Sequence, residues 1–218
     1  VVFAIDRGGL VGDDGETHQG AFDLAYLRMV PNLSLFVPRD EAGLSDALRT
    51  GLETPGIGPF AFRFPRAEGT HAARRPARVL PVGQGEILRE WSDVFVFGWG
   101  PILSKALAAA EKLEAEGIFV GVADLAWVKP LDKELVARIA RRVPRILTIE
   151  ECSLAGGAGS AVLEALAEAG LLAGLAVERI GFPDRFLEHG KIPLVAGRIG
   201  IDEAGILEKL RGLAPSVR

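Results

Sequence analysis

Apolar runs that alternate with segments of helical periodicity constrain the fold of this chain more than any other feature. In the second half, four such runs predict strands at residues 93–98, 118–122, 145–149 and 176–180. Between the first two, Ile102, Ala106, Leu107, Ala110 and Leu113 share one helical face. Continuous apolar strands separated by helices are typical of a mainly parallel sheet with helices on both faces.

The first 70 residues repeat this pattern. Residues 1–5 form an apolar run that we interpret as a buried strand, and 33–38 and 59–65 are also strand-like. Asp40 is a suitable N-cap for a helix over about 41–52. The sequence therefore predicts an α/β fold with two mainly parallel sheets flanked by helices.

A weaker pattern separates the two halves. Residues 71–91 begin with a basic, proline-containing stretch that is typical of a linker. We therefore predict one domain over 1–70, a linker over 71–91 and a second domain over 92–218.

Composition excludes several classes of function. The net charge of −4 gives no reason to expect nucleic-acid binding. No run of 18 apolar residues is present, so we expect no membrane span. The single cysteine, Cys152, rules out an internal disulfide and fits a reducing compartment, so we expect a cytoplasmic location. Because the chain opens on a core-like strand without an initiator Met, we expect it to be the C-terminal part of a longer protein.

A glycine-rich loop over residues 6–20 follows the first apolar run and carries several titratable side chains. α/β enzymes place their chemistry at such strand ends. His18 is the first catalytic candidate, because histidine can transfer protons near neutral pH; alternatively, it only fixes the turn. Asp14, beside Asp13 and Glu16, is the second candidate, although an acidic loop can also be a solvated turn. The alternating oxygen pattern of a calcium loop is absent.

Two arginines that follow strands are candidates for binding a phosphate. Arg7 follows residues 1–5 and Arg66 follows residues 59–64. A guanidinium can hold phosphate through two parallel charge-assisted bonds, and both cations would converge on one anion if their strands were neighbours. The alternative is that each arginine forms an ion pair at a strand end. Arg63 is a weaker candidate, because Pro65 breaks the strand alternation.

The segment 156–160 (GGAGS) precedes a helix and could suggest a phosphate loop. It lacks the lysine of a Walker motif and the spacing of a dinucleotide fingerprint, so it favours tight packing of helix against strand. Cys152 is interpreted as a small buried hydrophobic residue.

Together these motifs resemble the 1-deoxy-D-xylulose-5-phosphate synthases, which are transketolase-like enzymes that use thiamine diphosphate. No single segment is decisive, but the ordered set spans nearly the whole chain. The matching segments are DRGGLVG at 6–12, DG at 14–15, THQGAFD at 17–23, LRMVPN at 27–32, FRFPR at 62–66, VKPLD at 128–132, TIEE at 148–151, GGAGSAVLE at 156–164 and GFPDRFLEHG at 181–190.

This resemblance implies part of a pyrimidine-binding domain followed by a transketolase-like C-terminal domain, in a homodimeric enzyme. The implied reaction condenses pyruvate, with decarboxylation, and glyceraldehyde 3-phosphate, as the first step of non-mevalonate isoprenoid synthesis. By resemblance, His18 faces the intermediate and the acceptor, and Asp14 matches the active-site Asp. Arg7 and Arg66 match the arginines that hold the acceptor phosphate.

The sequence lacks the part of the family pattern that anchors the cofactor. The Gly-Asp-Gly motif and later Asn that hold the cofactor diphosphate and Mg²⁺ are missing. We therefore expect the residues that bind thiamine diphosphate and Mg²⁺ to lie upstream of Val1, in another portion of the same protein. The resemblance places the Glu that activates the aminopyrimidine ring there too. We expect no metal site in this chain.

Two further points concern the match to the family. Ala126 and Trp127 stand where the family often has an Arg, so a role for that Arg is not expected in this chain. Transketolase, the β-subunit of a 2-oxo acid dehydrogenase and a non-catalytic dimerisation module remain alternatives.

Overall fold

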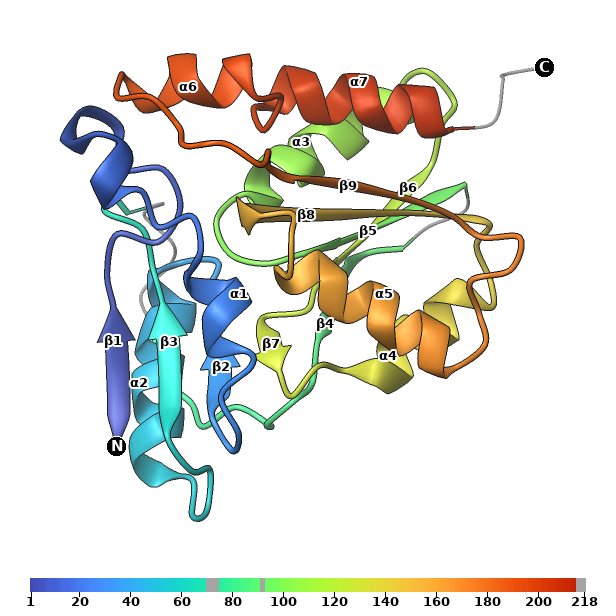
Figure 1. The fold of residues 1–218 in the computed structure, drawn as a ribbon. Helices are drawn as coiled ribbons and strands as arrows, with labels where there is room; N and C mark the ends of the chain where they lie inside the picture. The colour runs from blue at the N-terminus through green and yellow to red at the C-terminus, as the bar shows by residue number, and fades with distance from the viewer. Residues whose placement is uncertain (70–74, 91–92, 215–218) are drawn as a thin grey trace.

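The computed structural model describes residues 1–69, 75–90 and 93–214 and forms two sheets packed side by side (Figure 1). The strand orders are β1-β3-β2-β7 and β4-β6-β5-β8-β9. All pairings in both sheets are parallel except those of the edge strands β7 and β4. This confirms the prediction of two mainly parallel sheets flanked by helices.

The first sheet is built mostly from the first 63 residues. Its strands are β1 (Val2–Ile5), β2 (Ser34–Phe36), β3 (Phe60–Arg63) and β7 (Trp127–Lys129). Its helices are α1 (Asp23–Leu27) and α2 (Glu41–Glu53), and two short 3₁₀ turns, η1 (Gly12–Asp14) and η2 (Glu16–His18), lie in the loop after β1. The predicted cap of α2 is present, since Asp40 Oδ1 accepts a hydrogen bond from the Gly43 N–H over 2.7 Å.

The second sheet has helices on both faces. Its strands are β4 (Glu86–Arg89), β5 (Val94–Gly98), β6 (Val120–Asp124), β8 (Arg145–Ser153) and β9 (Ala176–Phe182). Its helices are α3 (Leu103–Glu114), α4 (Lys133–Ala140), α5 (Ala158–Glu168), α6 (Ile192–Arg198) and α7 (Glu203–Leu213). Every residue of β5 and β6 is buried, as expected for central parallel strands. No helix within the described residues is long and apolar enough to cross a bilayer.

Some elements differ from the sequence prediction. The prediction of a buried first strand is wrong: within the described residues β1 is an edge strand that pairs with β3 alone, and Phe3 is 48% exposed. Strands β4 and β7 and helix α6 were not foreseen. β4 lies inside the segment predicted as linker and pairs with β6, while residues 70–74 and 91–92 of that region lie outside the described part.

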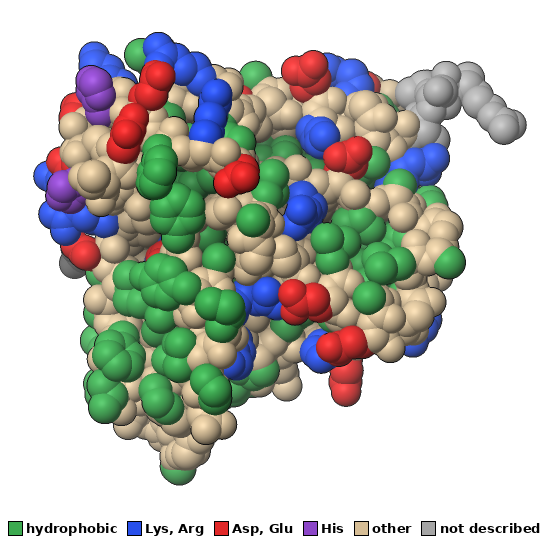
Figure 2. Space-filling view, viewed as in Figure 1, with side chains coloured by type: hydrophobic (Ala, Val, Ile, Leu, Met, Phe, Trp, Pro, Cys, Tyr) green, Lys and Arg blue, Asp and Glu red, His purple; other side chains and the backbone are tan. Residues whose placement is uncertain are grey.

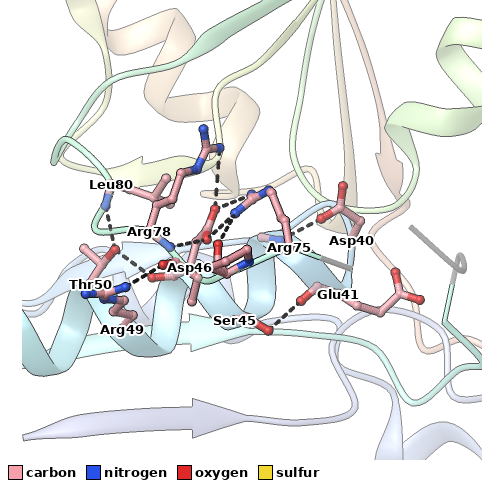
Figure 3. Close-up of polar contacts among 12 residues, drawn as sticks. Asp40, Glu41, Ser45, Asp46, Arg49, Thr50, Arg75, Arg78 and Leu80 are labelled. Atoms are coloured by element: carbon pink, nitrogen blue, oxygen red, sulfur yellow. Dashed lines mark hydrogen bonds and ion pairs between the residues drawn. The ribbon is translucent and has the colours of Figure 1, made fainter. Parts of the chain in front are cut away.

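The segment that leads into β4 is held along α2 by a buried carboxylate (Figure 3). Asp46 accepts hydrogen bonds from the Arg75 guanidinium, over 2.7 and 2.5 Å, and from the Arg78 N–H, over 2.7 Å. One turn later, Thr50 Oγ1 accepts from the Leu80 N–H over 2.8 Å. These contacts fix the path of residues 75–80 along α2.

The two halves share a core. Leu24 and Leu35 from the first half belong to the same buried cluster as Phe95, Phe97 and Trp99 from the second. Strand β7, from the second half, completes the first sheet by pairing with β2. The carboxyl ends of β1 and β3 are therefore fixed relative to β8.

Candidate functional site

The carboxyl ends of β1 and β3 bring the two predicted phosphate-binding arginines together. The strands are parallel neighbours, with Ile5 opposite Arg63, so Arg7 and Arg66 emerge at the same sheet edge. This is the strand arrangement that convergence of the two cations requires. Over the loop that follows β1, Figure 2 shows basic, acidic and histidine side chains gathered at the upper left.

Asp14 lies between the two guanidinium groups. Arg66 Nη1 donates to Asp14 Oδ2 over 2.5 Å, and Arg7 Nε lies 3.8 Å from the same oxygen. The Arg66 hydrogen bond is the main reason why the pKa of Asp14 lies below its ordinary value. Asp14 is therefore an ionised carboxylate at neutral pH that holds Arg66 by a hydrogen bond and lies near Arg7, whose Nη1 donates to Asp6 Oδ2 over 2.6 Å.

His18 ends the η2 turn and is exposed. Its Nδ1 lies 3.1 Å from Thr17 Oγ1, which orients the ring. Its charge contributes to lowering the pKa of Asp14, after the larger contributions of Arg66 and Arg7. The structure thus places all four predicted site residues in one cluster, with the arginines joined through the carboxylate and the histidine beside it.

Val1, upstream of which we expect the cofactor-binding residues, lies at the opposite end of β1 from this cluster (Figure 1). It is 86% exposed, and its carbonyl accepts a hydrogen bond from the Phe60 N–H over 3.0 Å. Val1 therefore extends the pairing of β1 with β3 and is not itself part of the candidate site. The expected location of the cofactor-binding residues stays a prediction.

The backbone of the loop after β1 is constrained. Arg7 has a φ of 56°, in the left-handed region that a non-glycine residue rarely adopts. Gly9 and Gly20 close the loop by exchanging N–H···O bonds of 3.1 and 2.9 Å, and Gln19 Oε1 accepts from the Val11 N–H over 2.8 Å. The loop is therefore a fixed platform for the site residues that it carries.

Arg63, the weaker phosphate candidate, has a structural environment that the sequence did not reveal. Its side chain is only 4% exposed, and its Nε lies 2.7 Å from Asp23 Oδ2. A charged residue in an otherwise apolar strand could have indicated this environment. A cation that is buried in such a strand needs a partner of opposite charge.

The glycine-rich segment before α5 serves the packing role that its sequence favours. The buried carboxylate of Glu150 accepts from the Ala158 and Gly159 N–H groups, over 2.6 and 2.8 Å. A Cβ on Gly159 would lie 2.5 Å from Thr148 Oγ1. The helix N-terminus is thus occupied by an internal carboxyl group. Burial raises the pKa of the Cys152 thiol to about 12, so this cysteine is an inert core residue.

The two positions where the family often has an Arg are part of the core. Trp127 is almost fully buried and packs edge-on against Phe36, with ring centroids 5.0 Å apart. Ala126 is also buried and has a φ of 48°. Neither side chain belongs to the cluster around Asp14.

A separate hollow of about 1000 Å³ lies between the β7–α4 connection and α5. Two of the four cations that line it are paired with carboxylates: Arg28 pairs with Glu164, and Lys133 lies 2.5 Å from Glu168. We place the candidate site at the Asp14 cluster instead, because two guanidinium groups converge there at a strand edge.

Comparison with known proteins now defines the class. Residues 83–206 match the model of the transketolase C-terminal domain, and residues 1–70 match that of the transketolase pyrimidine binding domain. The first match alone covers more than half of the chain, so the chain belongs to the transketolase family.

The similar curated proteins are named 1-deoxy-D-xylulose-5-phosphate synthase, which confirms the resemblance found in the sequence. The protein from Anaeromyxobacter sp. (strain K) is 50% identical over 98% of this chain, and that from Heliobacterium modesticaldum is 46% identical over 100%. This chain spans only 34% and 33% of those proteins, about one third of their length.

Solved structures agree with the fold. A structure titled split gene transketolase, inactive beta4 tetramer, has a TM-score of 0.81 and 32% identity, covering 97% of this chain and 65% of that one. Transketolase from Campylobacter jejuni has a TM-score of 0.70 at 21% identity, over 97% of this chain and 31% of that chain, and supports the fold alone.

Proposed function

We propose that this chain forms the acceptor side of the active site of a 1-deoxy-D-xylulose-5-phosphate synthase. The complete enzyme is a transferase that decarboxylates pyruvate and joins its two-carbon unit to glyceraldehyde 3-phosphate. The observation that carries this proposal is the convergence of Arg7 and Arg66 on Asp14. The similarity to proteins of that name supports the choice of substrates.

Each residue of the cluster has a distinct part in the proposal. Arg7 and Arg66 bind the acceptor phosphate through charge-assisted hydrogen bonds. Asp14 stays ionised and fixes the direction of the Arg66 guanidinium before the substrate arrives, while Asp6 accepts a hydrogen bond from Arg7. His18 lies beside them on an exposed turn, where it can hydrogen-bond the acceptor carbonyl or carry a proton.

Thiamine diphosphate belongs to the proposed enzyme, but the Gly-Asp-Gly motif and later Asn that would hold its diphosphate–Mg²⁺ end are missing from this chain. We therefore propose that a portion of the same protein upstream of Val1 holds this end of the cofactor.

A homodimer in the cytoplasm is also part of the proposal. A broad apolar area of the surface, which a second copy of the chain would cover, supports the homodimer. Figure 2 shows this area on the left of the molecule, over β1, β3 and α1. The large apolar side chains that are exposed on the chain include Phe3, Phe22, Tyr26, Met29 and Phe186. Sedimentation of the complete protein would measure its oligomeric state.

The experiment is a chimera in which this chain replaces the matching third of the Anaeromyxobacter synthase. The chimera should form 1-deoxy-D-xylulose 5-phosphate from pyruvate and glyceraldehyde 3-phosphate. Arg66→Ala should raise KM for glyceraldehyde 3-phosphate by about tenfold or more, because charge-assisted bonds to the phosphate are lost.

The matched control is an unphosphorylated aldehyde acceptor, for which Arg66→Ala should change little. An equal loss with both acceptors would remove Arg66 from the phosphate site. A folded chimera that uses other ketol donors but not pyruvate would favour transketolase instead.

A further inference from the structure

The guanidinium of Arg63 lies directly beneath the loop that follows β1 (residues 6–20, the site loop). Arg63 stands three residues before Arg66 and is the last residue of β3, in which every residue is buried. A Cβ on Gly8 would lie 2.5 Å from Arg63 Nε, so the start of the loop rests against this side chain. The Gly8 N–H is itself bonded to the Phe64 carbonyl over 2.9 Å.

The same side chain also binds the end of the loop and the second half of the chain. Arg63 Nη2 donates to the Gly20 carbonyl over 2.8 Å and to the Glu151 carbonyl, on β8, over 2.5 Å. Its Nε pairs with Asp23, whose carboxylate is also buried. One residue therefore touches both ends of the loop, the start of α1 and the C-terminal sheet.

The adjoining backbone strengthens this junction. The Ser153 N–H and the Cys152 thiol both donate to the Ala21 carbonyl, over 2.7 and 3.0 Å. The loop that carries the site residues is thus tied at its end to β8, with Arg63 at the centre of the contact.

We propose that Arg63 is a positioning residue, which aligns the site loop for the acceptor by clamping its two ends to each other and to β8. This inference rests on the proposed function. It requires arginine in particular, because a planar guanidinium can pair with Asp23 and donate to two carbonyls at once. A lysine could keep the ion pair but not the whole set of contacts.

Three variants test the proposal. Arg63→Lys keeps the charge beside Asp23 and removes the planar fork. The double variant Arg63→Met with Asp23→Asn removes both buried charges together, so that neither is left unpaired. Arg28→Ala is the matched control, because Arg28 also joins the two halves, through Glu164 and the Gly156 carbonyl, without touching the site loop.

The first measurement is amide hydrogen exchange in this chain. The Gly9 and Gly20 N–H groups, which close the loop, should lose protection in Arg63→Lys and in the double variant, while amides of β5 keep theirs. Arg28→Ala should leave the loop protected. Wild-type protection of both glycines in Arg63→Lys and in the double variant would overturn the clamp.

The second measurement is steady-state kinetics of the chimera. A misaligned loop should raise KM for glyceraldehyde 3-phosphate and lower kcat/KM by about 100-fold in both Arg63 variants. If Arg63 only maintains the fold, its substitution should lower the fraction of active enzyme, and hence kcat, at constant KM. Arg63→Lys should then be about as active as the unsubstituted chimera. That result would overturn the proposal. An unsubstituted chimera that folds but is inactive would refute the proposed function, while the exchange measurement would still decide the clamp.

Discussion

Arg63 and Arg66 lie three residues apart at the end of one strand, yet they belong to different environments. The Arg63 side chain is 4% exposed and is surrounded by protein acceptors, whereas the Arg66 side chain is 59% exposed and has Asp14 as its one ion-pair partner within the described residues. The chemistry of the two groups is the same. Burial therefore separates an arginine that organises the structure from one that remains available to a ligand.

Two carboxylates show the same contrast. Burial raises the pKa of Glu150 to about 7, although two helix N–H groups favour its ionised form. On the surface, the hydrogen bond from Arg66 lowers the pKa of Asp14. The buried region thus contains groups whose charge is costly, and the exposed region contains groups whose charge is ready for use.

The largest expected effect is that of a substitution in the exposed region, and it should change the reaction rate without changing the stability of the fold. His18→Ala in the chimera should reduce turnover by about 10²–10⁴-fold, because a positioned acid–base group is lost. The midpoint of thermal unfolding should not move, since the side chain is exposed. Unchanged turnover would remove His18 from the mechanism. A large loss of stability would mean that His18 maintains the structure, as the buried groups do.

In the buried region, the largest effect should be on stability. Arg63→Met leaves the Asp23 carboxylate buried without its partner and should cost about 3–5 kcal/mol in the free energy of unfolding. Denaturant titration of this chain measures that cost. Adding Asp23→Asn should recover much of the loss, because the unpaired charge is removed. A single variant as stable as wild type would mean that Arg63 is not a true buried ion-pair partner.

Glu150 should give the buried region its own pH dependence. Its pKa rises on folding from 4.5 to about 7, so the folded chain holds a proton that the unfolded chain has released. Its contribution to stability therefore falls as the pH rises from about 4.5 to about 7. Relative to Glu150→Gln, wild type should lose roughly 3 kcal/mol over this range. Urea unfolding at the two ends of this range tests the prediction, and parallel pH profiles would contradict it.

The smallest change in stability should come from Arg66→Met. This exposed ion pair should leave the unfolding midpoint within error of wild type. The affinity of the chain for inorganic phosphate should still fall by about tenfold, as measured by calorimetry. Arg211→Met, which removes another exposed arginine paired with a glutamate, is the control and should leave phosphate binding unchanged.

Much of the fold could be predicted because its signals are local. The Asp40 cap and the apolar core of β5 follow from a few adjacent residues. Strand β7 could not be predicted, because its three residues become a strand only through a long-range pairing with β2. The exposure of Phe3 depends on β1 having one neighbour, which no local pattern reveals.

The clustering of the candidate residues was predictable to the extent that strand ends concentrate polar side chains. The pattern of a loop after a strand pointed to Arg7, Asp14 and His18, and the parallel pairing of β1 with β3 placed Arg66 beside them. The carboxylate shared by the two arginines could not be foreseen from spacing. Nor could the clamp by Arg63, because its acceptors are main-chain carbonyls, which carry no signature in the sequence.

The pairing of β7 with β2 means that the boundary along the polypeptide is not a boundary in space. Cutting the chain between residues 70 and 83 would leave the first piece without an edge strand and with part of its core uncovered. The second piece would carry that strand with nothing to pair it. The two pieces should therefore act as complementary halves that recover a native structure when mixed, rather than as two modules that can be exchanged independently between proteins.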